Sequence, residues 1–172
     1  IAEPLIQLQK DVAPPVADGL GGQQAGEVAS QLAVETAWSS LYDSVWQEVM
    51  RGRAPDAEKL EQAVSQAIFE ANEAVYAERT DQASDMSTTI TLALAVGRRA
   101  YIGNVGDSRT YLWNADGLCR ITRDHSLVQR MVDAGRLEPE QVYTHPRRNI
   151  IYQSVGDRLD VQIDTFVMDL QE

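Results

Sequence analysis

The stretch STTITLALAV, residues 87–96, decides the fold class of this chain. Threonine or alanine alternates in it with larger aliphatic residues, and this period of two, together with the β-branched content, favours a strand. The aliphatic residues are Ile90, Leu92, Leu94 and Val96. Because successive side chains of a strand point to opposite sides, we expect these four to face a buried layer.

Three further strand patterns follow directly and are separated by short turns. They are RAYIGNV (99–105), SRTYLW (108–113) and LCRIT (118–122), with turns at Gly97-Arg98 and at NADG, 114–117. Strands joined by such short turns are antiparallel neighbours, so the pattern predicts an antiparallel meander.

The chain before this meander is mainly helical. Apolar residues recur at helical spacing over 25–50 and again over 56–79, where Asp56 can serve as the N-cap. Residues 1–17 contain three prolines and are expected to be irregular or an edge segment. Two long helices are thus expected before any clear strand.

The end of the chain adds two helical patterns and one strand. Residues 127–134 predict a helix with Gly135 as its C-cap, Pro139 can open a short helical turn, and VQIDTFVM (161–168) predicts a strand. Helices and hairpin-linked strands in separate blocks favour an α+β layered domain over a parallel βαβ fold.

The composition limits the classes of partner. With 172 residues, 44% of them hydrophobic, the chain can bury one core, which favours a single domain. Its 15 basic and 26 acidic residues give a net charge of −11, which opposes binding to nucleic acid or an anionic membrane and suits a protein that holds cations. The single cysteine, Cys119, rules out an intrachain disulfide. No apolar run has membrane-spanning length and the start resembles no secretion signal, so a cytoplasmic protein without a membrane segment is expected.

Three short motifs carry candidate chemistry. Asp18-Gly19 opens the run DGLGG directly before the first long helix, and Asp107 lies in NVGDSR between two strands. Each aspartate could project toward a ligand, but each motif taken alone favours turn chemistry. Asp124-His125 could be a base with its orienting carboxylate or a buried, structurally satisfied histidine.

Together, four segments resemble the metal-dependent protein serine/threonine phosphatases of type 2C, in a bacterial-type form. They are VADGLGGQQAGEVAS, DMSTTITLALAV, IGNVGDSRTYLW and ITRDHSLVQRMVDAGRLEPEQVYTHPRRNIIYQSVG, spanning residues 16–156. The resemblance implies two packed antiparallel β-sheets flanked by helices, an αββα sandwich. The chain would form one partial domain, 1–172, incomplete at both ends.

The resemblance also implies a site and an activity. Asp18 would bridge two Mg²⁺ or Mn²⁺ ions, the Gly19 carbonyl would complete one coordination sphere, and Asp107 would serve a third, weaker ion. A metal-activated water would hydrolyse phosphoserine or phosphothreonine in proteins that a serine/threonine kinase modifies. No catalytic side chain is assigned.

A mobile flap over 126–149, also implied by the resemblance, would help to select substrates. His145, Arg147 and Arg148 lie in its THPRRN run, where guanidinium groups could attract a phosphorylated partner or form a solvated edge. Arg109 and Asp124 are expected to hold loops by ion pairing.

The sequence departs from the family pattern at several places. The arginine and Asn-Glu-Asp-like motif that normally precede the first Asp-Gly are absent, as are the later Ser-Asp-Gly and Asp-Asn motifs, and Ser87 stands where glycine is common. VAPPVADG also replaces the usual apolar strand. We expect the missing ligands in a longer protein, with the present segment inactive by itself. The alternatives are an inactive relative that binds or regulates, and an unrelated acidic, metal-buffering domain.

Overall fold

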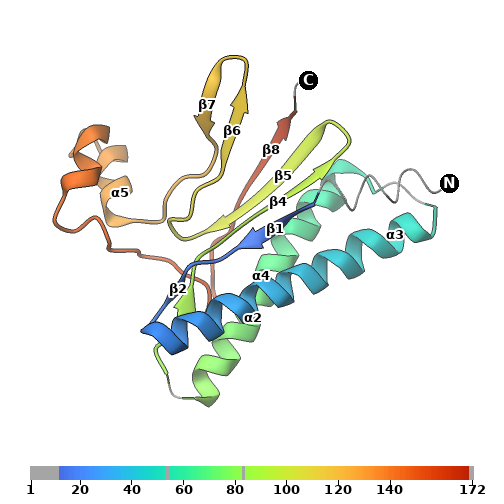
Figure 1. The fold of residues 1–172 in the computed structure, drawn as a ribbon, viewed down its shortest axis with the longest axis horizontal. Coiled ribbons are helices and arrows are strands. Elements are labelled where there is room, and N and C mark those ends of the chain that lie inside the picture. Colours follow the sequence, from blue (N-terminus) through green and yellow to red (C-terminus); the bar gives the residue numbers. More distant parts are fainter. Residues whose placement is uncertain (1–11, 53–54, 83, 171–172) are drawn as a thin grey trace.

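The computed structural model describes residues 12–52, 55–82 and 84–170, which form an α+β fold with antiparallel sheets (Figure 1). The elements in chain order are β1 (Val12–Val16), β2 (Gly19–Leu20), α2 (Gln23–Leu41), the π-helical η1 (Tyr42–Trp46), α3 (Gln47–Met50), α4 (Ala57–Asp81), β3 (Ser87–Thr88), β4 (Ile90–Val96), β5 (Arg99–Val105), β6 (Tyr111–Asn114), β7 (Gly117–Arg120), α5 (Leu127–Asp133), the 3₁₀-helical η2 (Pro139–Thr144) and β8 (Asp164–Asp169).

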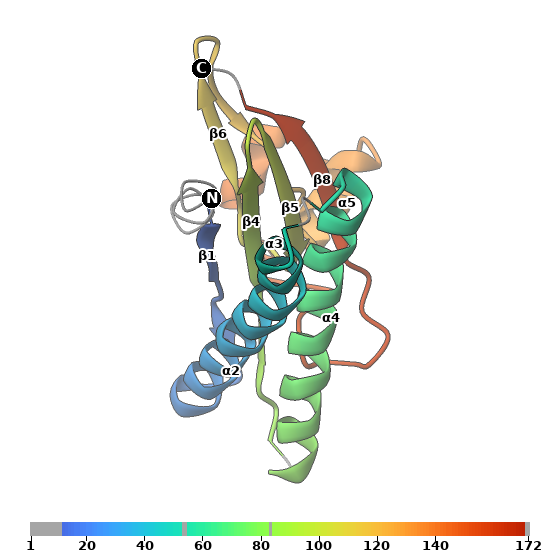
Figure 2. The same cartoon turned by 90° about the vertical axis from the view of Figure 1, so that its right-hand side faces the viewer.

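The central sheet has the order β1-β4-β5-β8, and all neighbouring strands are antiparallel. Helices α2 and α4 cover one face and meet Ile90, Leu92 and Leu94 in the core, where these side chains are at most 2% exposed. Val96 packs at the margin of the same core. The period-two prediction for residues 87–96 is therefore confirmed. In Figure 2 helices α2 and α4 lie in front of and below the sheet, and β6 of the hairpin is seen to the left of β4.

The predicted four-strand meander is wrong in one respect, because β6 pairs with β7 in a separate sheet and not with β5. The chain leaves β5 at Gly106, whose positive φ of 105° turns the backbone away from the sheet. On the second face of the sheet, the Thr91 hydroxyl hydrogen-bonds the Thr110 hydroxyl at 2.7 Å. The hairpin thus begins a second layer opposite the helices.

Two strands precede the long helices, so the expectation that helices come first is wrong. The edge prediction is confirmed for β1, which is the outer strand beside β4 in the described sheet. Its register slips between Ala13 and Val16, where Pro14 and Pro15 lack the N–H groups that a regular ladder needs. Residues 1–11 of that prediction lie outside the described residues.

The helices begin and end close to the predicted positions. Segments α2, η1 and α3 cover the predicted 25–50 helix, with one π turn in which Tyr42 stacks on Trp46 at 5.5 Å between ring centroids. The Asp56 carboxylate caps α4 by accepting the Lys59 amide at 2.9 Å. In the described ranges no helix is both long enough and apolar enough to cross a bilayer.

The run DGLGG requires glycines because the backbone of β2 is in direct contact with the backbone at the start of α2. A Cβ on Gly19 would lie 1.9 Å from the Gly26 carbonyl oxygen, and a Cβ on Gly26 would lie 2.8 Å from the Gly19 carbonyl carbon. Gly21 and Gly22, with φ of 101° and 87°, make the tight turn between them. This contact fixes the position of Gly19 and therefore that of the preceding residue, Asp18, between β1 and β2.

The loops around the hairpin base are held by the ion pair that the sequence predicts. The Arg109 guanidinium donates Nη2 to Asp124 Oδ2 at 2.6 Å and Nε to Oδ1 at 3.0 Å. These bonds raise the pKa of Arg109 above its ordinary value. The Asp124 side chain is only 4% exposed, so this pair is largely desolvated.

Gly26→Ala tests the contact between β2 and α2. Helix propensity alone predicts a gain of about 1 kcal/mol in the free energy of unfolding. The backbone clash predicts instead a loss of about 1–3 kcal/mol. Denaturant unfolding measures the sign, with the exposed Ser39→Ala in the same helix as control. A stabilised Gly26→Ala protein would contradict the contact.

Asp124→Asn tests the ion pair while keeping the side-chain shape. We expect a loss of about 2–3 kcal/mol in the free energy of unfolding, because Arg109 keeps its charge in a partly desolvated place without a carboxylate partner. The control is Asp169→Asn, which removes the exposed partner of Arg99 and should leave thermal unfolding unchanged. Equal losses of stability in the two variants would show that the burial of the Asp124–Arg109 pair does not increase its contribution to the free energy of unfolding.

Candidate metal centre

Asp18 is fixed through its backbone to the start of the β3–β4 segment. Its carbonyl oxygen accepts the Thr89 amide at 3.0 Å and the Thr88 hydroxyl at 2.9 Å. Its amide donates to the Thr89 hydroxyl oxygen at 3.2 Å. All three bonds use main-chain atoms of Asp18, so its exposed carboxylate is left available.

Thr89 also reaches the motif that contains Asp107. Its hydroxyl oxygen lies 2.6 Å from the Ser108 hydroxyl oxygen. Either hydroxyl can donate in this bond, because the Thr89 oxygen can accept a second hydrogen bond besides that from the Asp18 amide. One fully buried threonine therefore joins the two motifs, although they are far apart in the sequence.

Asp107 lies half-buried in a negatively charged setting. Burial raises the pKa of its carboxyl group above the ordinary value, and the charges of Asp124 and Asp18 raise it further. Its own backbone amide and Arg109 act in the opposite direction but do not reverse the shift. The two acidic motifs, joined through Thr89, thus lie in one region of the fold.

The chemistry of these donors fits a hard divalent cation, because carboxylate and carbonyl oxygens are the ligands that Mg²⁺ and Mn²⁺ prefer. A raised carboxyl pKa next to other carboxylates also marks a place where a cation would relieve repulsion. Over the described ranges, no three His, Cys, Asp or Glu side chains come together with metal-binding geometry. The residues present therefore match part of a metal site, and their role as ligands stays a prediction.

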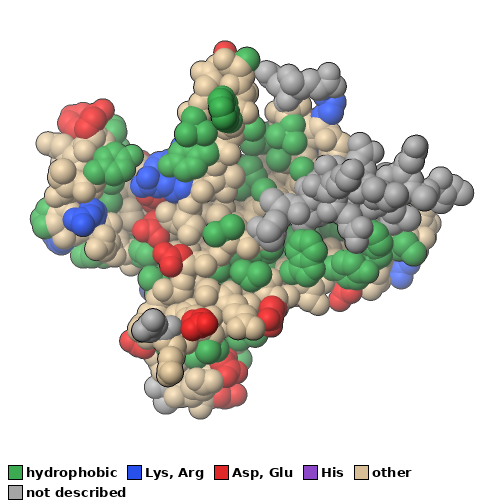
Figure 3. Space-filling view, in the orientation of Figure 1, with side chains coloured by type: hydrophobic (Ala, Val, Ile, Leu, Met, Phe, Trp, Pro, Cys, Tyr) green, Lys and Arg blue, Asp and Glu red, His purple; other side chains and the backbone are tan. Residues whose placement is uncertain are grey.

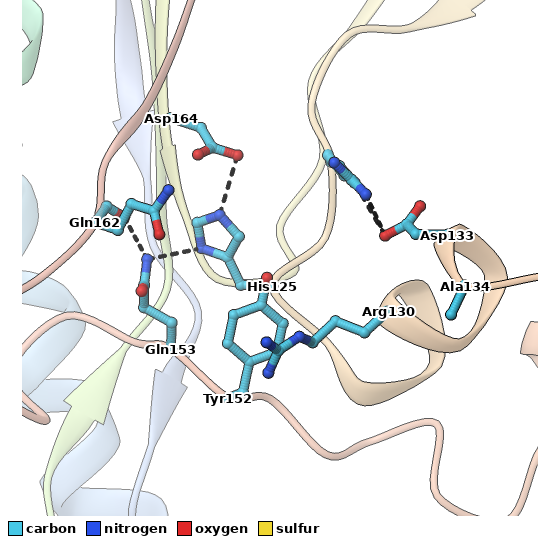
Figure 4. Close-up of a pocket in the computed structure, with 9 residues that line it drawn as sticks. His125, Arg130, Asp133, Ala134, Tyr152, Gln153, Gln162 and Asp164 are labelled. Atoms are coloured by element: carbon cyan, nitrogen blue, oxygen red, sulfur yellow. Dashed lines mark hydrogen bonds and ion pairs between the residues drawn. The ribbon is translucent and has the colours of Figure 1, made fainter.

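Asp124 and His125 do not form a base and orienting carboxylate. Asp124 pairs with Arg109, whereas His125 Nδ1 accepts the Gly106 amide at 3.1 Å and His125 Nε2 lies 3.1 Å from Asp164 Oδ2. Figure 4 shows His125 in the wall of a cavity of about 390 Å³ between α5 and the approach to β8. The structural alternative for this histidine is therefore confirmed.

Other charged groups of this cavity are already paired. Arg123 forms an ion pair with Asp133, and the Arg130 guanidinium stacks over the Tyr152 ring at 4.7 Å from its centroid (Figure 4). In Figure 3, acidic and basic side chains gather in the hollow between the α5 segment and the hairpin base.

The predicted flap residues form a local turn after η2. His145 Nδ1 accepts the Arg147 amide, and the His145 carbonyl oxygen accepts the Arg148 amide, both at 3.1 Å. Both arginines are exposed. The turn explains why a histidine precedes Pro146, while a role of these residues toward substrate stays a prediction.

Sequence reasoning missed two connections of the site. Nothing in the order of residues indicates that Thr89 links Asp18 to Ser108, or that His125 binds the backbone of Gly106. The bonds of Thr89 join the residue between β3 and β4 to two distant loops. The bond of His125 depends on where the chain returns after the β6–β7 hairpin. Both are tertiary contacts that no local pattern reports.

Comparison with known proteins identifies the family. A family model described as protein phosphatase 2C matches residues 6–133. The serine/threonine phosphatase stp of Listeria innocua is 37% identical over 158 residues, which are 91% of this chain and 60% of that protein. The protein phosphatase PhpP of Streptococcus pneumoniae is 33% identical over 150 residues, or 87% of this chain and 58% of that protein. The chain thus spans about 60% of the length of these relatives.

Solved structures agree with this assignment and with the α+β fold of antiparallel sheets. The crystal structure of the Mycobacterium tuberculosis phosphatase PstP/Ppp aligns with a TM-score of 0.77 at 33% identity, over 91% of this chain and 63% of that one. The catalytic domain of PstP in complex with two manganese ions aligns with a TM-score of 0.73 at 31% identity, over 91% and 61%. The chain belongs to the protein phosphatase 2C family.

Proposed function

We propose that the full-length protein hydrolyses phosphoserine and phosphothreonine in proteins, using Mg²⁺ or Mn²⁺. The observation that carries the proposal is the joining of the Asp18 and Asp107 motifs through Thr89. Similarity to serine/threonine phosphatases, and to a structure described with two manganese ions, supports it.

Asp18, the Gly19 carbonyl and Asp107 are the residues of this chain that would hold the ions. When bound, two such ions supply Lewis acidity that activates a water for attack on phosphorus. The protein contributes rigidity, because Asp18 is fixed by three backbone hydrogen bonds and Gly19 by its contact with Gly26. Asp107, with its repelling neighbours, would serve the third, weaker ion.

The exposed arginines Arg147 and Arg148, with His145, would help to attract the phosphoprotein as part of a flap over 126–149. Neither guanidinium makes a hydrogen bond or an ion pair with any other described residue. Guanidinium groups bind phosphate in a bidentate manner, which suits a substrate modified by a serine/threonine kinase. The net charge of −11 would on average repel an anionic substrate, so local positive groups are needed to attract it.

Asp18→Asn tests the proposal in the full-length protein. Asparagine keeps the shape of the side chain but removes the charge that would hold two cations together, so phosphate release from a phosphothreonine peptide with Mn²⁺ should fall at least about 100-fold. Thermal unfolding in a chelator should be close to that of the wild type, because the hydrogen bonds of Asp18 use its backbone.

Two comparisons complete this experiment. Wild-type activity should disappear with a chelator and return with Mn²⁺, and residues 1–172 alone should bind Mn²⁺ poorly because they bring together only two of the carboxylates. Turnover by the Asp18→Asn protein at the wild-type rate would refute the role of Asp18. A wild type that binds Mn²⁺ without turnover would indicate instead an inactive, binding relative.

A further inference from the structure

We propose that His125, oriented by Asp164, is a positioning residue that fixes the Gly106–Asp107 turn and thereby sets the affinity of Asp107 for a divalent ion. The inference rests on the proposed function, because it takes Asp107 as a ligand. It concerns residues that are far from Asp107 in the sequence and that touch no ion themselves.

The backbone of Gly106 is held on both sides by His125. The Gly106 amide donates to His125 Nδ1 at 3.1 Å, and the Gly106 carbonyl oxygen accepts the His125 amide at 2.8 Å. His125 is 4% exposed, so these bonds form away from water. Since Asp107 directly follows Gly106, a shift of this turn would move its carboxylate.

Among the described residues, the His125 ring supplies the hydrogen-bond acceptor for the Gly106 amide, while the other contacts of the turn act on its carbonyl oxygen or its neighbours. Gly106 has φ of 105°, and a Cβ at this position would lie 2.6 Å from the Thr89 Cβ, so the backbone packs directly against Thr89. The additional bond from Asn104 Nδ2 to the Gly106 carbonyl oxygen is long, at 3.4 Å. Without the acceptor on His125, the Gly106 amide would be buried with no partner, which costs free energy and favours another backbone conformation.

Asp164 determines which ring nitrogen of His125 can accept a hydrogen bond. Nδ1 faces two N–H donors, the Gly106 amide and Gln153 Nε2 at 3.2 Å, so it must be unprotonated. Nε2 then carries the proton and donates to Asp164 Oδ2 at 3.1 Å (Figure 4). A carboxylate beyond the histidine selects the tautomer, as partners of this kind do around metal-binding histidines.

The sheet places Asp164 for this task. Asn104 on β5 is in register with Thr91 on β4 and with Asp164 on β8, so the three side chains point to the same face of the sheet. Each one holds a different part of the 106–125 segment. Thr91 binds Thr110, Asn104 binds the Gly106 carbonyl oxygen, and Asp164 binds His125.

His125→Gln and His125→Asn form a matched pair of variants. Glutamine extends toward the Nε2 position and loses the acceptor for Gly106, whereas the asparagine Oδ1 occupies nearly the Nδ1 position and keeps it. Mn²⁺ binding to the full-length protein is measured by electron paramagnetic resonance. We expect His125→Gln to weaken the weakest Mn²⁺ step about 10-fold and His125→Asn to retain near wild-type affinity. Asp164→Ala should also weaken this step.

The reference variant is Asp107→Asn, which removes the proposed ligand itself. Ile68→Val, a core change on the opposite face of the sheet, controls for loss of stability alone and should leave all Mn²⁺ steps unchanged. If Asp107→Asn weakens Mn²⁺ binding but His125→Gln does not, the positioning role is refuted. Equal weakening by His125→Gln and His125→Asn refutes it as well, because the acceptor would then be irrelevant.

A measurement on the wild type covers the case in which a variant fails to fold. Nitrogen NMR of the imidazole should show the proton on Nε2, and the Gly106 amide should exchange slowly with solvent. A proton on Nδ1, or rapid exchange at Gly106, overturns the inference. A wild type that binds Mn²⁺ but releases no phosphate would refute the proposed function alone, because the effects of the variants on Mn²⁺ binding are still measurable.

Discussion

A chain of hydrogen bonds runs from the Asp18 amide through the Thr89 hydroxyl to the Ser108 hydroxyl, and the arrangement of the site depends on it. Thr89 is completely buried between the end of β3 and the start of β4, so its position is set by the core sheet and not by either loop. Two motifs on surface loops thereby acquire the rigidity of the sheet. A hydroxyl group suits this place because it can accept one bond and donate another.

Of the charged side chains around these hydrogen bonds, some have a partner of opposite charge and others do not. Arg109 neutralises Asp124, while Asp18 and Asp107 have no comparable bidentate cationic partner among the described residues. The folded protein therefore retains carboxylate repulsion that a more stable arrangement would remove. Such uncompensated charge is typical of functional sites, where the cost in stability is offset when the ligand binds.

Local patterns were sufficient for the elements themselves. Alternation predicted β4, helical spacing and the Asp56 cap predicted α4, and the prolines predicted an irregular or edge segment where β1 is the outer strand. Local patterns were insufficient where the chain passes from the central sheet to the β6–β7 hairpin. The turn at Gly106 looks like any tight connection between strands, yet its positive φ sends β6 away from β5. Whether β5 and β6 pair is decided by that backbone conformation and by the hydrogen bond between Thr91 and Thr110. The spacing of hydrophobic residues along the sequence indicates neither of them.

The same distinction applies to the site. Asp18 and Asp107 could be proposed because their motifs, in order with two further segments, resemble those of the family, whereas each motif alone favours turn chemistry. The partners of His125 could not, since Gly106 and Asp164 contribute a backbone amide and a carboxylate whose proximity depends on the register of β5 and β8. The adjacent pair Asp124-His125 also permits the interpretation of a base with its orienting carboxylate, whereas the two side chains bind different partners.

The two prolines of β1 have a consequence for self-association. Successive backbone amides of a strand point to opposite sides, so of Pro14 and Pro15 one lacks a donor toward β4 and the other lacks a donor toward the open side. The slipped register is the effect toward β4. On the other side, where no strand of the described ranges pairs with β1, a strand from another molecule would meet an interrupted row of donors on a bulged backbone, which makes continuous intermolecular pairing unfavourable. The proline pair that disturbs the regularity of this sheet thus also disfavours the pairing of another strand along that edge.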